Sequence, residues 1–394
     1  MSDSRSSVFA GREEREGFER NGLAPFACRS ADSRGRLVDE AQHPIRTCFQ
    51  RDRDRVVHST AFRRLQYKTQ VFVHHEGDHF RNRLTHTLEG AQIARTIARA
   101  LRLNEDLAEA IALAHDLGHT PFGHAGERVL ARLLVNQGGF DHNRQSLRVV
   151  DWLELRVPEV PGLNLTDETR EGILKHGCAW NHPVRVPELG SCRPLEAQVA
   201  DASDEIAYVN HDLDDALRAG LLRIDDMGDL ALVAQVRSEV EQEFPDASPA
   251  LRQARMIARL IDGLVNDLVA QTASNLLAAR IDSLAAVRGH SSNLVGLSVE
   301  FDDGRRELKA FLFEHFYNHP MVTARTEKAE QIVEDLFTAF CERPERLPAR
   351  IRDRFGGESE SRVIADYVAG MTDRFAVAEH RKLVGPTEET ALDL

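Results

Sequence analysis

Residues 84–117 of the chain, LTHTLEGAQIARTIARALRLNEDLAEAIALAHDL, hold the pattern that decides the fold class. Apolar side chains recur every three or four positions on both sides of Asn104, which is the spacing of one face of an amphipathic helix. Asn104 itself is a good N-cap, because its side chain accepts a hydrogen bond from the first turn of a helix that follows it. The stretch therefore predicts two consecutive helices, 84–101 and 105–117.

The same helical spacing continues along most of the chain. Only TQVFV (69–73) is β-prone, and a polar segment with a glycine break follows it. The sequence contains no internal repeat and no series of alternating strands. We therefore expect an all-α fold, a multi-helix bundle with at most a small β-hairpin near residues 69–80. The further helical patterns cover 52–68, 126–135, 143–155, 168–176, 195–220, 227–285, 303–316, 325–341 and 360–378.

The chain divides into three parts, although no shift of composition marks a sharp boundary. Residues 1–50 are rich in Arg, Ser, Gly and Asp and lack a sustained period, so we expect an extended N-terminal arm there. Residues 51–220 contain the chemically informative motifs and form the expected core. Residues 221–394 are expected to form a helical region that packs on that core.

The composition is that of an ordinary soluble globular protein. Of the 394 residues, 42% are hydrophobic and 29% are charged. No run of 18 apolar residues is present, so we expect no membrane span, and the polar first residues predict no secretory signal. The five cysteines are scattered without a CxxC pair, which argues against a disulfide framework or a cysteine zinc site and predicts a cytoplasmic protein.

The net charge of the chain is −13, from 50 Lys and Arg against 63 Asp and Glu. Such an acidic chain is not a general nucleic-acid coat, although a local basic groove for nucleic acid stays open. Between Arg51 and Arg95, nine basic residues stand against five acidic ones, a local net charge of +4. That segment either meets an anionic ligand or forms an ordinary solvated helix face.

Histidine is concentrated in one part of the chain. Imidazole is the commonest metal ligand and the usual acid or base near neutral pH, but a single histidine on a helix is more often structural. The position of each histidine therefore matters more than the number. Of the 17 histidines, nine lie within 85 residues, at positions 58, 74, 75, 79, 86, 115, 119, 124 and 142.

Four of these positions suggest a metal site. His115 and Asp116 lie late on an otherwise apolar helix, where an ionised carboxylate is costly unless it is paired or bound to a cation. His86 begins the preceding predicted helix, and Asp204 lies among apolar positions of the helix over 195–220. Two imidazoles and two carboxylates form an N₂O₂ set that suits a divalent transition metal.

Seven blocks of sequence resemble those of a known family. The resemblance is to the HD-domain phosphohydrolases and, more narrowly, to the deoxynucleoside triphosphate triphosphohydrolases of the dGTPase-like family. The block over 114–127 is far more specific than an HD pair alone, since His211-Asp212 is a second such pair in this chain. The blocks span about 310 residues and are FRRLQYKTQVF (62–72), RNRLTHTLE (81–89), AHDLGHTPFGHAGE (114–127), FDHNRQS (140–146), ILKH (173–176), DASDEIAYVNHDLDDA (201–216) and ADYVAGMTDRF (365–375).

The resemblance implies a role for each of several residues. The two residues that correspond to the catalytic pair, His124 and Glu127, are spaced i, i+3, so they share a helix face on which the carboxylate can orient the imidazole. An ordinary alternative for His124 is a solvent-exposed residue at a helix start. The residues that correspond to the metal ligands are His86, His115, Asp116 and Asp204.

The resemblance also implies a substrate-binding set, for which ordinary structural roles stay open. The ordinary structural roles would be a surface ion pair for Arg83, core packing for Tyr208 and a place on a solvated helix face for Asp212. The sequence reads FDHN (140–143), where the family is expected to have FEHN. By resemblance, phosphate contacts come from Arg83, His119 and Lys175, the sugar 3′-OH contact from Gln70, deoxyribose recognition from Tyr208 and Asp212, and a further active-site pair from His142 and Asn143.

The implied reaction is metal-dependent hydrolysis of deoxynucleoside triphosphates, with dGTP as the default, to deoxynucleoside and inorganic triphosphate by attack at the α-phosphorus. The implied cofactor is Mn²⁺, Mg²⁺ or another first-row divalent ion. A homo-oligomer is expected, with LKAFLFEHFYNHP (308–320) as a candidate for subunit contacts and a regulatory nucleotide at an interface as a further hypothesis. Two alternatives stay open: another HD phosphohydrolase, acting on deoxynucleoside monophosphates or phosphodiesters, and a nucleotide-sensing or single-strand nucleic-acid-binding protein.

Overall fold

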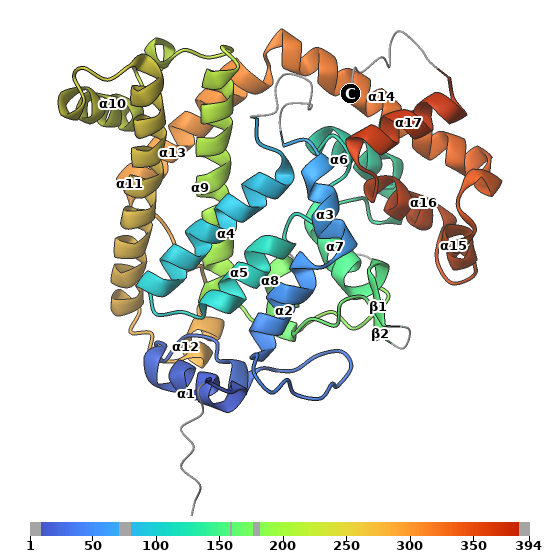
Figure 1. Cartoon of the computed structure of the whole chain (residues 1–394), viewed down its shortest axis with the longest axis horizontal. Coiled ribbons are helices and arrows are strands. Elements are labelled where there is room, and N and C mark those ends of the chain that lie inside the picture. Colours follow the sequence, from blue (N-terminus) through green and yellow to red (C-terminus); the bar gives the residue numbers. More distant parts are fainter. Residues whose placement is uncertain (1–8, 71–79, 158–159, 176–181, 386–394) are drawn as a thin grey trace, which may run out of the picture.

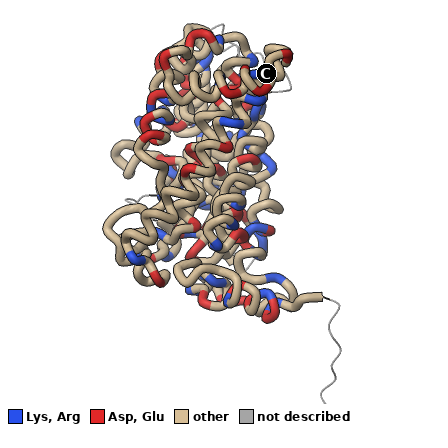
Figure 2. The backbone as a smooth tube through the Cα atoms, turned by 90° about the vertical axis from the view of Figure 1, so that its left-hand side faces the viewer, with Lys and Arg blue, Asp and Glu red and all other residues tan. Residues whose placement is uncertain are grey.

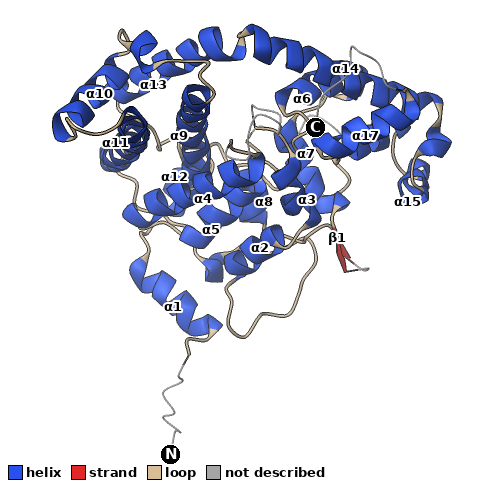
Figure 3. Cartoon of the chain, turned by 45° about the horizontal axis from the view of Figure 1, so that its top comes forward, coloured by secondary structure: helices blue, strands red, loops and turns tan. Residues whose placement is uncertain are grey.

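The computed structural model describes residues 9–70, 80–157, 160–175 and 182–385, and nearly all regular structure in these ranges is helical (Figures 1 and 3). The predicted all-α class is therefore confirmed. The described strands are β1 (Leu155–Val157) and β2 (Val160–Pro161), which pair antiparallel. They lie where the sequence predicts the end of a helix and a loop. The hairpin predicted near residues 69–80 falls mostly on 71–79, outside the described residues.

The first part of the core is a bundle around three long helices whose ends the sequence marks. Asn82 caps the first of them through a capping box with Thr85, and Asn104 caps the second. Their apolar faces share one hydrophobic cluster that includes Ile97 and Ile111. The helices are α4 (Arg83–Ala100), α5 (Glu105–Ala114) and α9 (Leu195–Arg218), with α2 (Cys48–Val57), α3 (Thr60–Arg64) and α8 (Asp167–Ile173) packed beside them.

The C-terminal helices pack on this bundle from two sides (Figure 1). One cluster centres on Leu336 and Phe340, and the other on Leu260 and Phe316. The first cluster joins α6 (His124–Leu133) to α14 (Pro320–Glu342), α16 (Glu360–Ala369) and α17 (Asp373–Leu383). The second joins the end of α9 to α10 (Ala231–Glu243), α11 (Pro249–Ala278) and α13 (Val299–Leu312). The shorter helices are α7 (His142–Arg148), α12 (Leu284–Gly289) and α15 (Ala349–Arg352).

The segment over residues 1–50, predicted as an extended arm, contains the start of α2 at Cys48 and one further α-helix, α1 (Arg12–Gly22). This helix has no buried residue, so it lacks the apolar stripe that would reveal it in the sequence. It is held in part by an ion pair between Arg12 and Glu16, whose nearest atoms lie 2.6 Å apart, one helical turn along.

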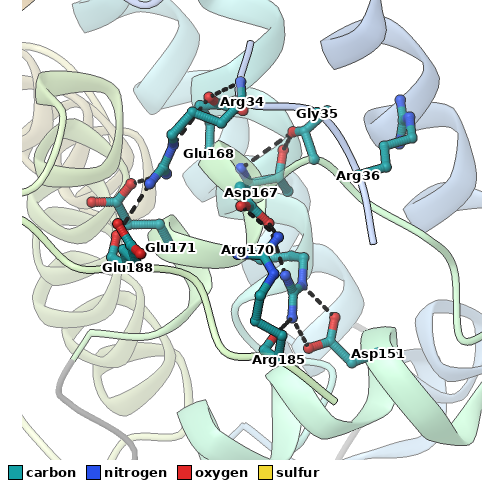
Figure 4. Close-up of polar contacts among 12 residues, drawn as sticks. Arg34, Gly35, Arg36, Asp151, Asp167, Glu168, Arg170, Glu171, Arg185 and Glu188 are labelled. Carbon is teal, nitrogen blue, oxygen red and sulfur yellow. Dashed lines mark hydrogen bonds and ion pairs between the residues drawn. The ribbon is translucent and has the colours of Figure 1, made fainter. Parts of the chain in front are cut away.

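A network of buried charges ties residues 33–36 to α8 (Figure 4). Arg34 Nε lies 3.3 Å from Glu168 Oε1, and the backbone N–H of Asp167 donates to Gly35 O at 3.0 Å. The N-terminal segment therefore packs on the core through specific polar contacts. Over the rest of the molecule, basic and acidic residues are interspersed along the helices (Figure 2). Among the described residues, no helix is both long and apolar enough to cross a lipid bilayer.

Candidate active site and metal centre

Three helices bring the four predicted metal ligands together. His86 lies near the start of α4, His115 and Asp116 directly follow α5, and Asp204 lies in α9. Asp204 Oδ1 lies 3.2 Å from His86 Nε2 and 3.3 Å from His115 Nε2, and His115 Nε2 lies 3.2 Å from Asp116 Oδ1. Ligand atoms that share one ion at bond lengths near 2.1 Å lie roughly 3 Å apart. The spacing of His86, His115 and Asp116 therefore fits a single bound ion, and Asp204 lies beside both imidazoles.

The orientation of His115 also fits a metal ligand. Its Nδ1 lies 2.6 Å from Ala112 O, so Nδ1–H donates to that carbonyl. Its buried Nε2 faces the carboxylate oxygens of Asp116 and Asp204 without a well-directed hydrogen bond to any described residue. Burial lowers the pKa of His115, but the carboxylates of Asp116 and Asp204 outweigh it and raise the pKa to about 9. The two carboxylates thus draw positive charge to this point, and a divalent cation supplies such charge.

Two basic side chains predicted to contact phosphate lie directly behind the carboxylates. Arg83 Nη1 donates to Asp116 Oδ2 at 3.1 Å, and Lys175 Nζ donates to Asp204 Oδ2 at 3.0 Å. Burial opposes ionisation of both carboxylates, yet these cations and the nearby imidazoles hold the pKa of each well below its usual range. Each carboxylate therefore keeps one oxygen on a cation and directs the other toward His115.

A second group of side chains, His119, His124, Glu127 and His142, lies beside the first. Their ligand atoms all lie within 4.8 Å of one another. Glu127 Oε2 lies 3.0 Å from His124 Nδ1, as the i, i+3 spacing predicts, and Glu127 Oε1 lies 2.8 Å from His142 Nδ1. The ring of His119 stacks on that of His142, with centroids 4.1 Å apart. The Nε2 atom of His119 lies 3.1 Å from Asp116 Oδ1. His119 therefore joins the two groups.

Two further predicted residues, Tyr208 and Asp212, extend the site along α9. The Tyr208 ring stacks on that of Tyr317, with centroids 6.2 Å apart, and the Tyr317 hydroxyl donates to Asp212 Oδ2. Burial raises the pKa of Asp212 to about 7. Gln70 Oε1 and Asn143 Oδ1 are buried and have no hydrogen-bond partner among the described residues, so both are available to a ligand.

Sequence reasoning misses two residues of this site. Tyr317 falls in the run considered for subunit contacts, and nothing local connects it to Asp212, which is 105 positions away. In the sequence, His211 stands out only as part of a second HD pair, but its Nδ1 lies 3.1 Å from His86 Nδ1. A hydrogen bond at that atom orients the His86 ring so that Nε2 faces Asp204.

Comparison with known proteins agrees with this geometry. Residues 83–209 match the HD domain, and residues 295–382 match the phosphohydrolase-associated domain. HD domains hold divalent metal ions, and two sets of side chains have ligand atoms close enough together to hold one: His86, His115 and Asp116, and the second group of His119, His124, Glu127 and His142.

The chain also has many close relatives, each named deoxyguanosinetriphosphate triphosphohydrolase-like protein. The one from Ralstonia nicotianae is 51% identical, over 92% of this chain and 94% of the relative. Those from Thiobacillus denitrificans and Geobacter metallireducens are 49% and 47% identical, over 93% and 94% of this chain and 98% and 97% of the relatives. The chain therefore belongs to the dGTPase-like family of HD-domain phosphohydrolases.

Proposed function

We propose that this protein hydrolyses deoxynucleoside triphosphates, with dGTP as the default substrate, to deoxynucleoside and inorganic triphosphate. The observation that carries the proposal is the convergence of His86, His115, Asp116 and Asp204, with distances of 3.2–3.3 Å between neighbouring donors, beside the imidazole group held by Glu127. The names of the relatives support a nucleoside triphosphate substrate.

The four converging side chains would hold a divalent ion such as Mn²⁺ or Mg²⁺. When bound, such an ion supplies Lewis-acid polarisation of a phosphate oxygen and lowers the pKa of a coordinated water. The mixed nitrogen and oxygen donors suit several first-row metals, so the proposal names no native metal.

His124 and Glu127 would form the proton-transfer pair. Glu127 accepts the Nδ1–H of His124, which leaves His124 Nε2 as the atom that takes or gives a proton. The His124 side chain is 54% exposed, so a substrate can reach that atom. His142 donates to the other oxygen of Glu127 and so fixes the carboxylate between two imidazoles.

Basic side chains near the metal ligands would bind the triphosphate. Arg83 Nε is buried without a hydrogen-bond partner among the described residues and can donate to a phosphate oxygen. His119 Nε2 faces Asp116 Oδ1, so His119 would contact phosphate through Nδ1 only when its imidazole is protonated. Lys175 adds a second positive charge on the other side of Asp204. Basic groups held in a buried site stabilise phosphate charge more strongly than the same groups in water.

The residues farther along α9 would recognise the sugar. Tyr208 would pack under the 2′ carbon and exclude a ribose hydroxyl by crowding, next to Asp212. Gln70 Oε1 would accept the 3′-OH, and Asn143, beside His142, would line the same site. The structural alternatives for these residues predict no change of substrate choice when they are replaced.

The deciding experiment is a chromatographic product assay. Wild type and Asp116→Ala would be incubated with each of the four dNTPs, with and without Mn²⁺. We expect deoxynucleoside and tripolyphosphate to be released only by the wild type, and only when Mn²⁺ is present. Orthophosphate as the product, or turnover of monophosphates instead, would assign the protein to another class of HD phosphohydrolase. Nucleotide binding without turnover would favour a sensing role.

Assembly and location complete the proposal. The proposed parts are an N-terminal arm (1–50), an HD core (51–220) and a C-terminal region (221–394) that mediates a cytoplasmic homo-oligomer and binds a regulatory nucleotide at an interface. Phe313, in the run over 308–320, is 63% exposed, which supports a role in subunit contacts. A fully active monomer at micromolar concentration would contradict the assembly.

A further inference from the structure

Asp373 is a buried acid for which the proposed chemistry has no role. It begins α17 within the block ADYVAGMTDRF and is 1% exposed. Its Oδ1 accepts the backbone N–H of Phe122 at 2.9 Å, and its Oδ2 accepts the backbone N–H of Thr69 at 2.8 Å and the Thr69 hydroxyl. Three donors therefore compensate a carboxylate that would otherwise be costly to bury.

The two segments that Asp373 connects both carry predicted site residues. Thr69 directly precedes Gln70, which is proposed to hold the sugar 3′-OH. Phe122 lies in the turn between His119 and His124, the residue proposed to transfer a proton. One carboxylate from the C-terminal region therefore contacts the backbone at both ends of the proposed substrate site.

The turn at Phe122 needs such a contact. Phe122 has φ +59° and Gly123 has φ +56°, and a bulky residue in this left-handed region persists only when its surroundings hold it. The Phe122 side chain is buried in the cluster formed with the C-terminal helices. An added Cβ at Gly123 would lie 2.8 Å from Arg83 Nη2 and 3.5 Å from Thr69 O, so the turn packs directly against the Gln70 segment.

Lys68 makes a second link between the same elements. Its buried Nζ donates to His119 O and, at 3.0 Å, to Ala369 O at the end of α16. The residue before Thr69 is thus tied to the start of the turn and to the C-terminal region. These contacts fix the separation of the Gln70 segment from the His119–His124 turn.

We propose that Asp373 is a positioning residue that aligns the sugar-binding Gln70 with the proton-transferring His124. The inference rests on the proposed function, because it assigns those two roles. Gln70 would act at the 3′ side of the sugar and His124 at the 5′ oxygen, so a change in their separation misaligns every bound substrate. The C-terminal region thereby takes part in substrate selection through a residue that does not itself touch the substrate.

The test compares Asp373→Asn with Asp335→Asn. The side-chain amide introduced by Asp373→Asn cannot accept hydrogen bonds at both of its terminal atoms, so one of the two segments is released. Asp335 is a matched control, because its Oδ2 lies 2.8 Å from His380 Nε2. This contact also fixes helix α17, but at a point that is remote from the proposed substrate site. Thr69→Val is a milder variant that removes only the hydroxyl donor.

The first readout is the ratio of kcat/KM for a dNTP to that for the matching 2′,3′-dideoxy analogue. We expect Asp373→Asn to lower kcat/KM for the dNTP at least tenfold and to move the ratio to that of Gln70→Ala, with a smaller change of the same sign in Thr69→Val. Asp335→Asn should keep the wild-type ratio even if its Tm falls. A wild-type ratio in Asp373→Asn overturns the inference, and if that variant does not fold, a wild-type ratio in Thr69→Val does so.

The second readout needs no turnover. Hydrogen exchange should become faster in peptides covering residues 119–127 in Asp373→Asn, and not in Asp335→Asn. Wild-type exchange rates in Asp373→Asn, or the same increase in both variants, overturn the inference. A wild type that hydrolyses no dNTP would instead contradict the proposed function, and the exchange comparison would still decide whether Asp373 holds the turn.

Discussion

The Arg170 guanidinium and the charges around Asp116 are equally buried, but among the described residues only the guanidinium has an acceptor at each of its nitrogens. We call the surroundings of Arg170 the balanced region and those of Asp116 the unbalanced region. Arg170 Nε and Nη2 each donate to one oxygen of Asp151 at 2.7 Å, and Nη1 donates to Asp167 at 2.9 Å (Figure 4). Around Asp116, by contrast, the described residues leave Arg83 Nε and His119 Nδ1 buried without a hydrogen-bond partner, and His115 Nε2 faces two carboxylate oxygens without a well-directed hydrogen bond.

This difference separates structural charge from functional charge. A planar guanidinium that matches a carboxylate geometrically satisfies both groups, so nothing further is needed at Arg170. Buried polar atoms without a partner are rare in folded proteins, and a group of them indicates a place for a ligand. Helix α8 joins the two regions, since it contains Arg170 and ends two residues before Lys175, which reaches Asp204.

The largest effect should follow from a change in the unbalanced region. Asp204→Asn removes the carboxylate oxygen that lies 3.2 Å from His86 and 3.3 Å from His115. We expect dNTP turnover with Mn²⁺ to fall roughly 10³-fold or more. In metal-free buffer the free energy of unfolding should fall by less than the roughly 3–5 kcal/mol typical of breaking a fully buried ion pair, because the Asp204 side chain is 24% exposed. Thermal unfolding should also show that Mn²⁺ raises Tm for the wild type alone, and an equal rise in the variant would contradict the assignment.

The balanced region should show the opposite behaviour. Arg170→Met leaves Asp151 and Asp167 buried without their main partner, so the free energy of unfolding should fall by about 3–5 kcal/mol. Urea denaturation at pH 7 measures this loss. The control is Arg185→Met, because Arg185 also pairs with Asp167 but is 54% exposed and should contribute less than about 1 kcal/mol. A similar small loss in both variants would show that the Arg170 group does not hold the fold.

The sequence predicts the elements that carry an apolar stripe. The helix predicted over 195–220 is observed as Leu195–Arg218, and the one over 84–101 as Arg83–Ala100, because capping and helical periodicity are local properties. Helix α1 escapes such reasoning because charge pairs, not buried apolar residues, hold it. The helical patterns predicted over 227–285 are given without internal boundaries, whereas the chain forms separate helices on either side of Pro245.

Contacts between distant residues limit what the sequence tells about the site. The four proposed metal ligands can be predicted from the sequence, because His115-Asp116 is an unusual pair on an apolar helix and because the surrounding blocks resemble those of a known family. The contacts of Asp212 with Tyr317 and of Asp373 with Thr69 join residues 105 and 304 positions apart. No local periodicity records such pairs, so their partners become visible only in the folded chain.

The most gradual expected effect, spread over several pH units, concerns a carboxylate in the unbalanced region, Asp212. Burial raises its pKa from 3.8 to about 7, although a hydrogen bond from Tyr317 opposes the shift. Between these values the folded protein binds a proton that the unfolded chain releases. Asp212 therefore makes the free energy of unfolding fall as pH rises from 4 to 7, by at most about 1.4 kcal/mol per pH unit.

An asparagine at position 212 does not titrate, so the folded Asp212→Asn variant no longer binds that extra proton. The free energy of unfolding of the variant should therefore fall less steeply than that of the wild type between pH 4 and pH 7. Urea denaturation of both proteins in metal-free buffer across this range measures the difference. Asp246→Asn, which changes an exposed acid, should keep the wild-type slope. If Asp212→Asn also keeps it, Asp212 is ionised throughout the range, and the hydrogen bond from Tyr317 outweighs burial in setting the charge of this carboxylate.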